Sequence, residues 1–214
     1  KTVILLAAEH KDNVSPTDLY YDVNVKGTKN VLEKMDDLNI KNLIFTSSVA
    51  VYGLNKKNPN EDFKKDPFNH YGKSKYQAEK VIMEWYNKNP DNKSVSIVRP
   101  TVIFGRNNRG NVYNLFKQLA SGRFVMIGSG LNKKSMAYID NVTSFIYHLC
   151  IKSEKGFNIY NYSDKPDLNM NELIDIIKKH LKLSIINVKI PYLLGLFLSY
   201  IFDFVSLISN KKLA

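Results

Sequence analysis

The sequence has very little cysteine and histidine and lacks most of the common signatures of catalysis. Its 214 residues include one Cys and four His. They contain no Cys/His cluster with zinc spacing, no H-E-x-x-H, no G-x-S-x-G and no P-loop. No metal site is therefore predicted. The single Cys150 excludes an internal disulfide, and its apolar neighbours predict a structural thiol in a reducing cytosol.

The charge of the chain is strongly basic but is not concentrated in one block. Lys and Arg number 31 against 20 Asp and Glu, a formal net charge of +11. The lysines are scattered and no nucleic-acid motif accompanies them, so nucleic acid is not a predicted partner. An anionic substrate and an anionic membrane surface both remain open. No signal peptide is recognisable, and a cytoplasmic location is expected.

The hydrophobic pattern alternates between short apolar runs and amphipathic stretches. Strands are predicted over residues 3–8, 43–47, 95–99, 124–127 and 157–161, and helices over 19–38, 71–87, 112–121 and 169–181. This alternation is typical of an α/β fold with a parallel sheet. Ligands of such folds bind at the carboxyl ends of the strands.

One strand and the helix after it carry the candidate chemistry. The run from Leu43 ends in the hydroxyls of Thr46, Ser47 and Ser48, and the helix that follows begins with Tyr71 and Lys75. Residues four apart share a helix face, so the Lys75 ammonium should favour the phenolate of Tyr71 and lower its pKa. Ser48 could then hydrogen-bond a substrate hydroxyl while Tyr71 removes its proton.

Five segments together resemble a known family. They are Leu6 to His10, Tyr20 to Val25, Ser47 to Lys56, Asn69 to Lys75 and Arg99 to Gly105. The chain resembles the extended short-chain dehydrogenase/reductases of the NAD-dependent sugar epimerase/dehydratase family, and within it the 4-epimerases of lipid-linked N-acetylhexosamines that serve surface polysaccharide (O-antigen, lipopolysaccharide) synthesis.

The resemblance implies a Rossmann-like, doubly wound parallel sheet over residues 1–105 and a small C-terminal α/β substrate domain over 106–214. The family places further βα units and a glycine-rich pyrophosphate turn before such a first strand, and no G-x-G-x-x-G occurs here. We therefore expect a fragment that lacks its N-terminal nucleotide half. A homodimer of the full-length protein is also implied.

The resemblance further implies an NAD-dependent 4-epimerase, in which hydride leaves the sugar for NAD and returns to its other face. The implied catalytic residues are Ser48, Tyr71, Lys75 and Asn24, where Asn24 supports Lys75. Contacts to NAD are implied for Ala7, Ala8, Tyr71, Lys75 and Pro100, and contacts to substrate for Ser48, Val49, Arg106 and Lys134.

Departures from the family bear on the substrate. Val102 stands where nucleotide-sugar epimerases commonly carry an Asn that contacts the diphosphate, and Lys134 stands where relatives carry Arg. A substrate linked through diphosphate to undecaprenol is therefore expected, with a UDP-sugar as the alternative. Val49 and Ala50 replace the Asp-Glu pair of the related dehydratases, which argues against dehydration. A reductase or hydroxysteroid-like dehydrogenase and a non-catalytic dinucleotide-sensing scaffold are further alternatives.

The last apolar run, residues 193–209, carries one charge, Asp203. As a helix it would be about 25 Å long, short of a hydrocarbon core of about 30 Å. Polar or small residues form one narrow stripe, at Gly195, Ser199, Asp203, Ser206 and Asn210. Burial against another part of the protein and peripheral contact with the inner face of the cell membrane both remain open.

Overall fold

The computed structural model describes residues 1–11, 14–183 and 188–209, which form two compact units. Unit 1 comprises Lys1–Gly105 and Met136–Asp164, and unit 2 comprises Arg106–Ser135 and Lys165–Ala214. The chain passes from unit 1 to unit 2 after Gly105 and returns to unit 1 at residues 136–164, which supply a strand and a helix to its sheet. The predicted division into a dinucleotide-binding domain and a substrate domain stays a prediction.

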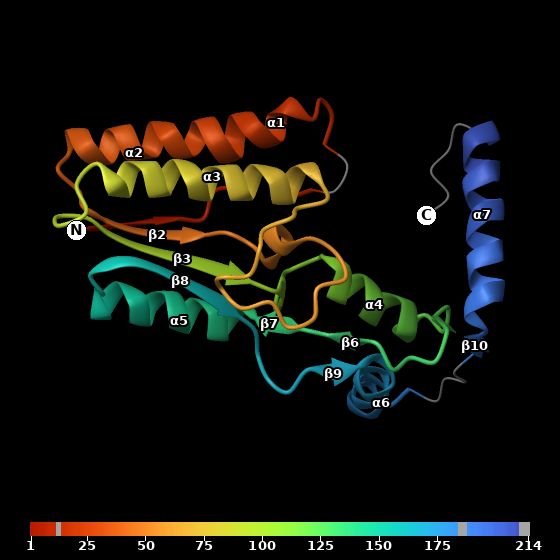
Figure 1. Ribbon diagram of the computed structural model, residues 1–214. Helices are drawn as coiled ribbons and strands as arrows, with labels where there is room; N and C mark the ends of the chain where they lie inside the picture. The colour runs from red at the N-terminus through yellow and green to blue at the C-terminus, as the bar shows by residue number, and fades with distance from the viewer. Residues whose placement is uncertain (12–13, 184–187, 210–214) are drawn as a thin grey trace. The chain divides into compact units, whose positions relative to one another are not determined.

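Unit 1 is built on a four-stranded parallel sheet in the order β1-β2-β3-β8. Its strands are β1 (Thr2–Leu5), β2 (Asn42–Thr46), β3 (Ser94–Pro100) and β8 (Gly156–Tyr162). One face is covered by α1 (Asp18–Tyr21), the π-helical turn η1 (Asp22–Lys26), α2 (Gly27–Asp37) and α3 (His70–Asn87), and the other by α5 (Ile139–Lys152) (Figure 1). This arrangement confirms the predicted Rossmann-like class.

Alternation along the strands divides the core between the two faces. Phe45 and Ile97 pack with Leu32, Ile82 and Trp85 beneath the helices α2 and α3. Their strand neighbours Ile44 and Val98 instead pack with Leu149 of α5. Successive strand residues point to opposite sides, so a strand buried on both faces must be apolar at nearly every position.

Two predicted elements differ from the observed ones. The first strand ends at Leu5 rather than at residue 8, and the helix predicted over 19–38 contains the π-helical turn η1. Such a turn inserts one residue and rotates the helical turns after it, so Leu32 and Met35 are buried while Leu38 is exposed. The 3₁₀ turn η2 (Val49–Tyr52) and the short parallel pair β4 (Val102–Phe104) and β7 (Met136–Tyr138) also belong to unit 1.

The described residues of unit 2 form three helices and two small sheets. Its elements are α4 (Asn111–Ala120), β5 (Val125–Ile127), β6 (Lys133–Lys134), β9 (Leu168–Asn169), α6 (Met170–Leu181), β10 (Val188–Ile190) and α7 (Tyr192–Ser209). β5 pairs with β10 in parallel and β6 with β9 in antiparallel fashion. A capping box begins α6: Asn169 accepts from the Glu172 amide at 3.0 Å, and the Glu172 carboxylate accepts from the Asn169 amide at 2.8 Å.

Helix α7 exposes much of its apolar surface. Gly195 is buried against β5, where a Cβ would lie 2.5 Å from Cγ2 of Ile127. Leu193 and Phe197 are 77% and 62% exposed. The side chains of Asp203 and Ser206, and all of Asn210, lie outside the described residues, so the predicted polar stripe is seen only at its first two positions. Among the described residues, no helix is both long and apolar enough to cross a membrane.

Candidate active site

The predicted site residues of unit 1 gather at the carboxyl edge of the sheet. Ala7 and Ala8 follow β1, Ser48 follows β2, and Pro100 is the last residue of β3. These strands are parallel and in register, with Leu5 opposite Phe45 and Thr46 opposite Val98. The three strand ends therefore open on one edge, where ligands of such sheets bind.

Close packing between η2 and α3 brings Ser48 and Tyr71 together. Ser48 caps η2, and its Oγ accepts a hydrogen bond from the Ala50 amide at 3.1 Å. Asn69 caps α3 by accepting from the Gly72 amide at 2.8 Å. A Cβ on Gly72 would lie 2.7 Å from the carbonyl oxygen of Ala50. Only glycine lets the first turn of α3 approach the Ser48 turn this closely.

The phenol of Tyr71 is largely buried and has a raised pKa. Burial raises the pKa of Tyr71, and a hydrogen bond with the Ser48 side chain lowers it part of the way back. The prediction that Lys75 lowers this pKa is not met, since the Lys75 ammonium lies over the Phe45 ring, 4.2 Å from its centroid. With its raised pKa, the Tyr71 phenol is protonated at neutral pH.

Lys75 lies on the same helix face as Tyr71, as predicted, and is only 2% exposed. Burial lowers its pKa to about 8, and the charge of Glu79 opposes that shift. Among the described residues Lys75 belongs to no ion pair. Its ammonium donors are therefore available to a ligand hydroxyl.

Asn24 lies in η1 and joins two segments of the site. Its amide accepts from the Glu9 amide at 2.8 Å and donates to the Glu9 carbonyl at 3.0 Å and to Ser74 Oγ at 2.8 Å. Ser74 in turn donates to the carbonyl of Tyr71 at 2.9 Å. These bonds tie the segment after β1 to the first turn of α3. The expected support of Lys75 by Asn24 stays a prediction.

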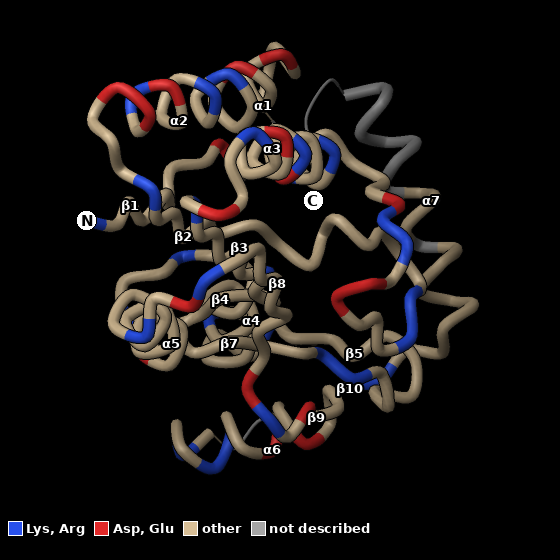
Figure 2. Tube along the Cα trace, turned by 60° about the vertical axis from the view of Figure 1, so that its left-hand side comes forward, with Lys and Arg blue, Asp and Glu red and all other residues tan. Residues whose placement is uncertain are grey.

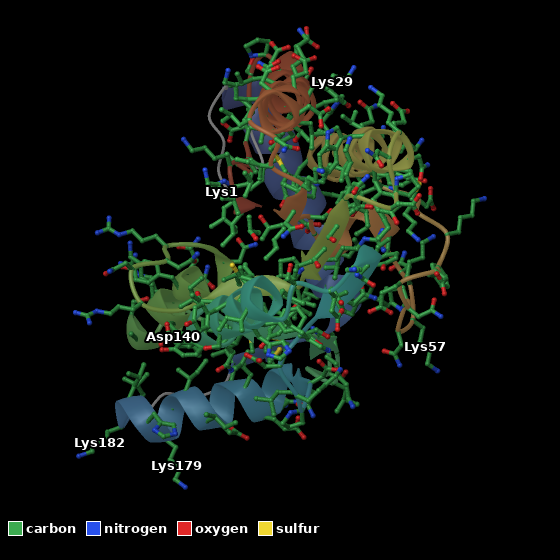
Figure 3. All side chains as sticks on the ribbon, turned by 90° about the vertical axis from the view of Figure 1, so that its left-hand side faces the viewer. Lys1, Lys29, Lys57, Asp140, Lys179 and Lys182 are labelled. Atoms are coloured by element: carbon green, nitrogen blue, oxygen red, sulfur yellow. The ribbon has the colours of Figure 1, made fainter. Side chains whose placement is uncertain are left out.

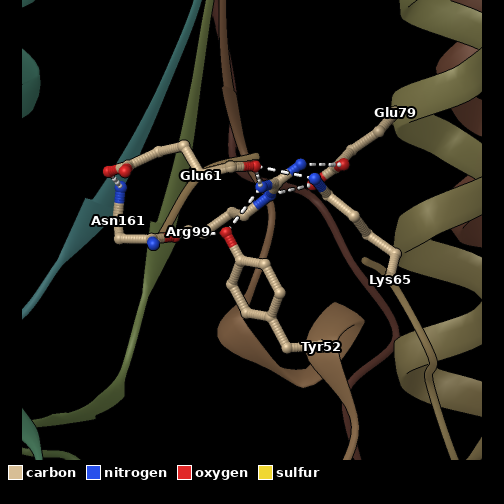
Figure 4. A network of polar contacts seen from close by, with 6 residues as sticks. All are labelled: Tyr52, Glu61, Lys65, Glu79, Arg99 and Asn161. Carbon is tan, nitrogen blue, oxygen red and sulfur yellow. Dashed lines mark hydrogen bonds and ion pairs between the residues drawn. The ribbon is translucent and has the colours of Figure 1, made fainter. Parts of the chain in front are cut away.

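A buried ionic network next to the site was not predicted from the sequence (Figure 4). Arg99 of β3 donates from Nε and Nη2 to the Glu79 carboxylate, at 2.9 and 2.7 Å. Its Nη1 donates to the Tyr52 hydroxyl at 2.6 Å and to the Glu61 carbonyl at 3.0 Å. Asn161 completes the network by accepting from Tyr52 at 2.7 Å. The sequence feature that could have indicated this network is Glu79, because an acidic residue on the apolar face of a helix needs a buried partner.

Two buried hydroxyls near the strand ends have no partner in the described part of the chain: Ser47 Oγ and Thr101 Oγ1. Ser47 precedes Ser48, and Thr101 follows Pro100. Buried polar atoms are normally paired, so unpaired ones at a ligand-binding edge fit a polar ligand. Together with the Lys75 ammonium, they are chemically suited to the hydroxyl-rich ribose and the amide of a nicotinamide nucleotide.

The predicted substrate residues fall into both units. Val49 is half-buried in η2, beside Ser48. Arg106 and Lys134 belong to unit 2, where Arg106 is exposed and Lys134 lies in β6, so their part in the site stays a prediction. Val102 pairs with Met136 between β4 and β7 and presents no hydrogen-bonding group.

Comparisons with known proteins identify the family. Residues 1–162 match the model of the NAD dependent epimerase/dehydratase family, and the chain belongs to that family. An Escherichia coli O157:H7 protein, N-acetyl-alpha-D-glucosaminyl-diphospho-ditrans,octacis-undecaprenol 4-epimerase, is 59% identical over 213 residues, covering all of this chain and 64% of that protein. A UDP-glucose 4-epimerase of Vibrio cholerae is 31% identical over 165 residues, 74% of this chain and 49% of that protein.

A solved structure has the same fold. The UDP-glucuronic acid 4-epimerase of Bacillus cereus, crystallised with NAD, superposes with a TM-score of 0.77 at 21% identity, covering 89% of this chain and 62% of the other. This chain therefore spans less than two thirds of the length of these relatives.

Proposed function

We propose that the protein is an NAD-dependent 4-epimerase that interconverts N-acetylglucosamine and N-acetylgalactosamine linked through diphosphate to undecaprenol. The observation that carries the proposal is the 59% identity over 213 residues to an enzyme of that name. The close packing of η2, which follows Ser48, against the first turn of α3, which holds Tyr71, supports it. The likeness to solved epimerases below 25% identity supports the fold alone.

The chain's own residues supply the proton chemistry. Tyr71 removes the proton of the sugar 4-hydroxyl, and Ser48 hydrogen-bonds the same oxygen. Lys75 binds the nicotinamide ribose, and its charge lowers the pKa of Tyr71 once a ligand draws the ammonium away from the Phe45 ring. Asn24 fixes the first turn of α3 through Ser74.

NAD is the proposed cofactor, held by Ala7, Ala8, Lys75 and Pro100. It would accept a hydride from the sugar and give it back, so that no net oxidation occurs. The side chains of Val49 and Ala50 carry no proton donor, which supports epimerisation over the elimination that related dehydratases perform.

The charge of unit 2 supports an anionic substrate presented at a membrane. Unit 2 holds 13 Lys and Arg against four Asp and Glu, a net +9, whereas unit 1 holds 18 against 16, a net +2. Figure 2 shows Lys and Arg in blue and Asp and Glu in red along the Cα trace. Figure 3 shows Lys179 and Lys182 extending from α6. We propose that Arg106 and Lys134 neutralise the diphosphate. Arg106 would do so through its forked guanidinium and Lys134 as a point charge.

The exposed apolar face of α7 supports peripheral contact with an anionic bilayer, where a polyprenyl-linked substrate would reside. Leu193, Phe197 and Tyr200 are among its exposed side chains. An amphipathic helix in a basic unit binds such surfaces through apolar burial and electrostatic attraction together. The proposed role is therefore in surface polysaccharide synthesis at the cytoplasmic leaflet.

The test compares two substrates in one detergent. Purified full-length protein with added NAD should interconvert the N-acetylhexosamines of the undecaprenyl diphosphate, with UDP-N-acetylglucosamine turned over far more slowly. Tyr71→Phe serves as the matched inactive control. Equal turnover of the two substrates would contradict the lipid assignment and favour a UDP-sugar epimerase. Stoichiometric oxidation or reduction of the cofactor would favour a dehydrogenase.

A further inference from the structure

Lys75 poses an electrostatic question that the proposed chemistry does not answer. The side chain is almost completely removed from solvent and its end lies over the Phe45 ring. A charged amine is costly in such a place, because the lost hydration is replaced only by weaker contacts. The proposed role of Lys75 nevertheless requires an ammonium ion. Some other group must keep it charged.

Burial distinguishes Glu79 among the charged groups around Lys75, because this residue is only 5% exposed. On the elements packed against α3, Asp22 pairs with Lys26 at 2.6 Å, Asp36 with Lys93 at 3.3 Å and Lys34 with Asp37 at 3.2 Å. Asp18, Lys29 and Glu33 on the same elements are exposed. On β2 the neighbour is the Phe45 ring, and on η2 the Tyr52 hydroxyl binds Arg99. On α3 itself, the raised pKa of Tyr71 keeps the phenol neutral at pH 7. Glu79 is the carboxylate whose charge acts on Lys75.

The position of Glu79 follows from the helix. Tyr71, Lys75 and Glu79 are spaced four residues apart, so they form one row on the buried face of α3. A buried carboxylate is tolerable only when it is paired, and both Glu79 oxygens are bound by the Arg99 fork. The guanidinium is held in turn by Tyr52 and by the Glu61 carbonyl. Four segments of unit 1 thus fix this one carboxylate.

We propose that Glu79, held in place by Arg99, is a positioning residue that supplies the counter-charge keeping Lys75 an ammonium ion beside Tyr71. The two carboxylate oxygens are immobilised by bidentate bonds, so the charge stays at a fixed distance from Lys75 whether or not a ligand is bound. The inference rests on the proposed function only for the task given to Lys75.

The resting protein provides the direct test. The ¹³Cε resonance of Lys75, identified by its loss in Lys75→Met, is followed against pH in lysine-labelled protein without sugar or cofactor. The wild-type midpoint is expected near the pKa of about 8. In Glu79→Gln the midpoint should fall by at least one pH unit, so the charged fraction at pH 8 drops from about one half to about one tenth or less.

Glu84→Gln is the matched control, since it removes an exposed carboxylate from the same helix and should leave the midpoint unchanged. A folded Glu79→Gln protein with the wild-type midpoint would overturn the proposal. If Glu79→Gln does not fold, the double variant Glu79→Gln/Arg99→Met removes both buried charges at once. Its midpoint should fall as well, and an unchanged midpoint there would count equally against the proposal.

Activity provides a second, separable readout. In Glu79→Gln the alkaline limb of the pH–turnover profile should move at least one unit toward acid, which a purely structural role would not cause. Arg99→Lys keeps the charge of residue 79 and should keep the limb in place. Absence of epimerase activity would count against the proposed function alone, because the titration needs no substrate. An unchanged Lys75 titration would remove the inference even in an active epimerase.

Discussion

Replacing Lys75 by Met should make the unliganded protein more stable at neutral pH while abolishing its proposed activity. The pKa of Lys75 falls from 10.5 to about 8 on folding. Below pH 8 the side chain is charged in both the folded and the unfolded states, and only the folded state loses the hydration of that charge. Met occupies a similar volume and carries no charge, so the variant avoids this loss.

The magnitude follows from the linkage between protonation and folding. Between pH 8 and 10.5 the unfolded chain binds a proton at residue 75 that the folded chain does not, so wild-type stability rises with pH. Each pKa unit corresponds to about 1.4 kcal/mol. From pH 6.5 to pH 9.5 the wild type should therefore gain about 2 kcal/mol of unfolding free energy relative to Lys75→Met.

Urea unfolding of both proteins at a series of pH values from 6.5 to 9.5 measures this difference. Lys73→Met, which changes an exposed lysine of the same helix, supplies the baseline. The variant should be more stable than wild type at pH 6.5, and the gap should close with rising pH. A gap that stays constant with pH, or a wild type that is the more stable at pH 6.5, would refute the burial argument.

Three further changes test other parts of the proposed function. Tyr71→Phe should lower turnover by a factor on the order of 100 or more with unchanged circular dichroism, and near-normal turnover would remove Tyr71 from the mechanism. Gly72→Ala places a Cβ 2.7 Å from the carbonyl oxygen of Ala50, so it should destabilise the fold by about 1–3 kcal/mol and lower turnover. An unchanged midpoint of urea unfolding would show that α3 can move away from η2 without cost. Phe197→Ser combined with Ile201→Ser should weaken binding to phosphatidylglycerol vesicles at least tenfold, since each apolar contact contributes roughly 1–3 kcal/mol. The control Ile176→Ser, which changes an exposed apolar residue of α6, should leave binding unchanged. Equal vesicle binding by the wild type, the double variant and the control would exclude α7 from the membrane contact.

The buried face of α3 could be predicted because its signal is local. Tyr71, Lys75, Ala78, Ile82 and Trp85 follow the 3.6-residue period, and the last four are buried as that period requires. Strand β2 could also be predicted from a local signal, because its apolar run is continuous. A pattern of this kind fixes which face of a helix is buried without any knowledge of the partner.

The ionic network could not be predicted because its members are far apart in sequence. Arg99 and Glu79 meet only because β3 lies beneath α3, and Asn161 joins them from β8. The π-helical turn at Asn24 likewise leaves no periodic signal in the sequence, and the helix after it buries Leu32 and Met35 while Leu38 is exposed. The pKa of Tyr71 differed from expectation because spacing places Lys75 on the right face but does not determine where its ammonium points.

The route of the chain between β3 and β8 has a consequence for how the protein folds. These strands pair directly, yet residues Ser94 and Gly156, which face each other, are about 60 positions apart along the chain. During synthesis β1, β2 and β3 emerge well before β8, so β3 must wait with one edge unpaired while part of unit 2 is made. Pairing between distant segments slows folding and leaves an open strand edge exposed to other chains. We expect the nascent chain to depend on chaperones until residue 162 has left the ribosome.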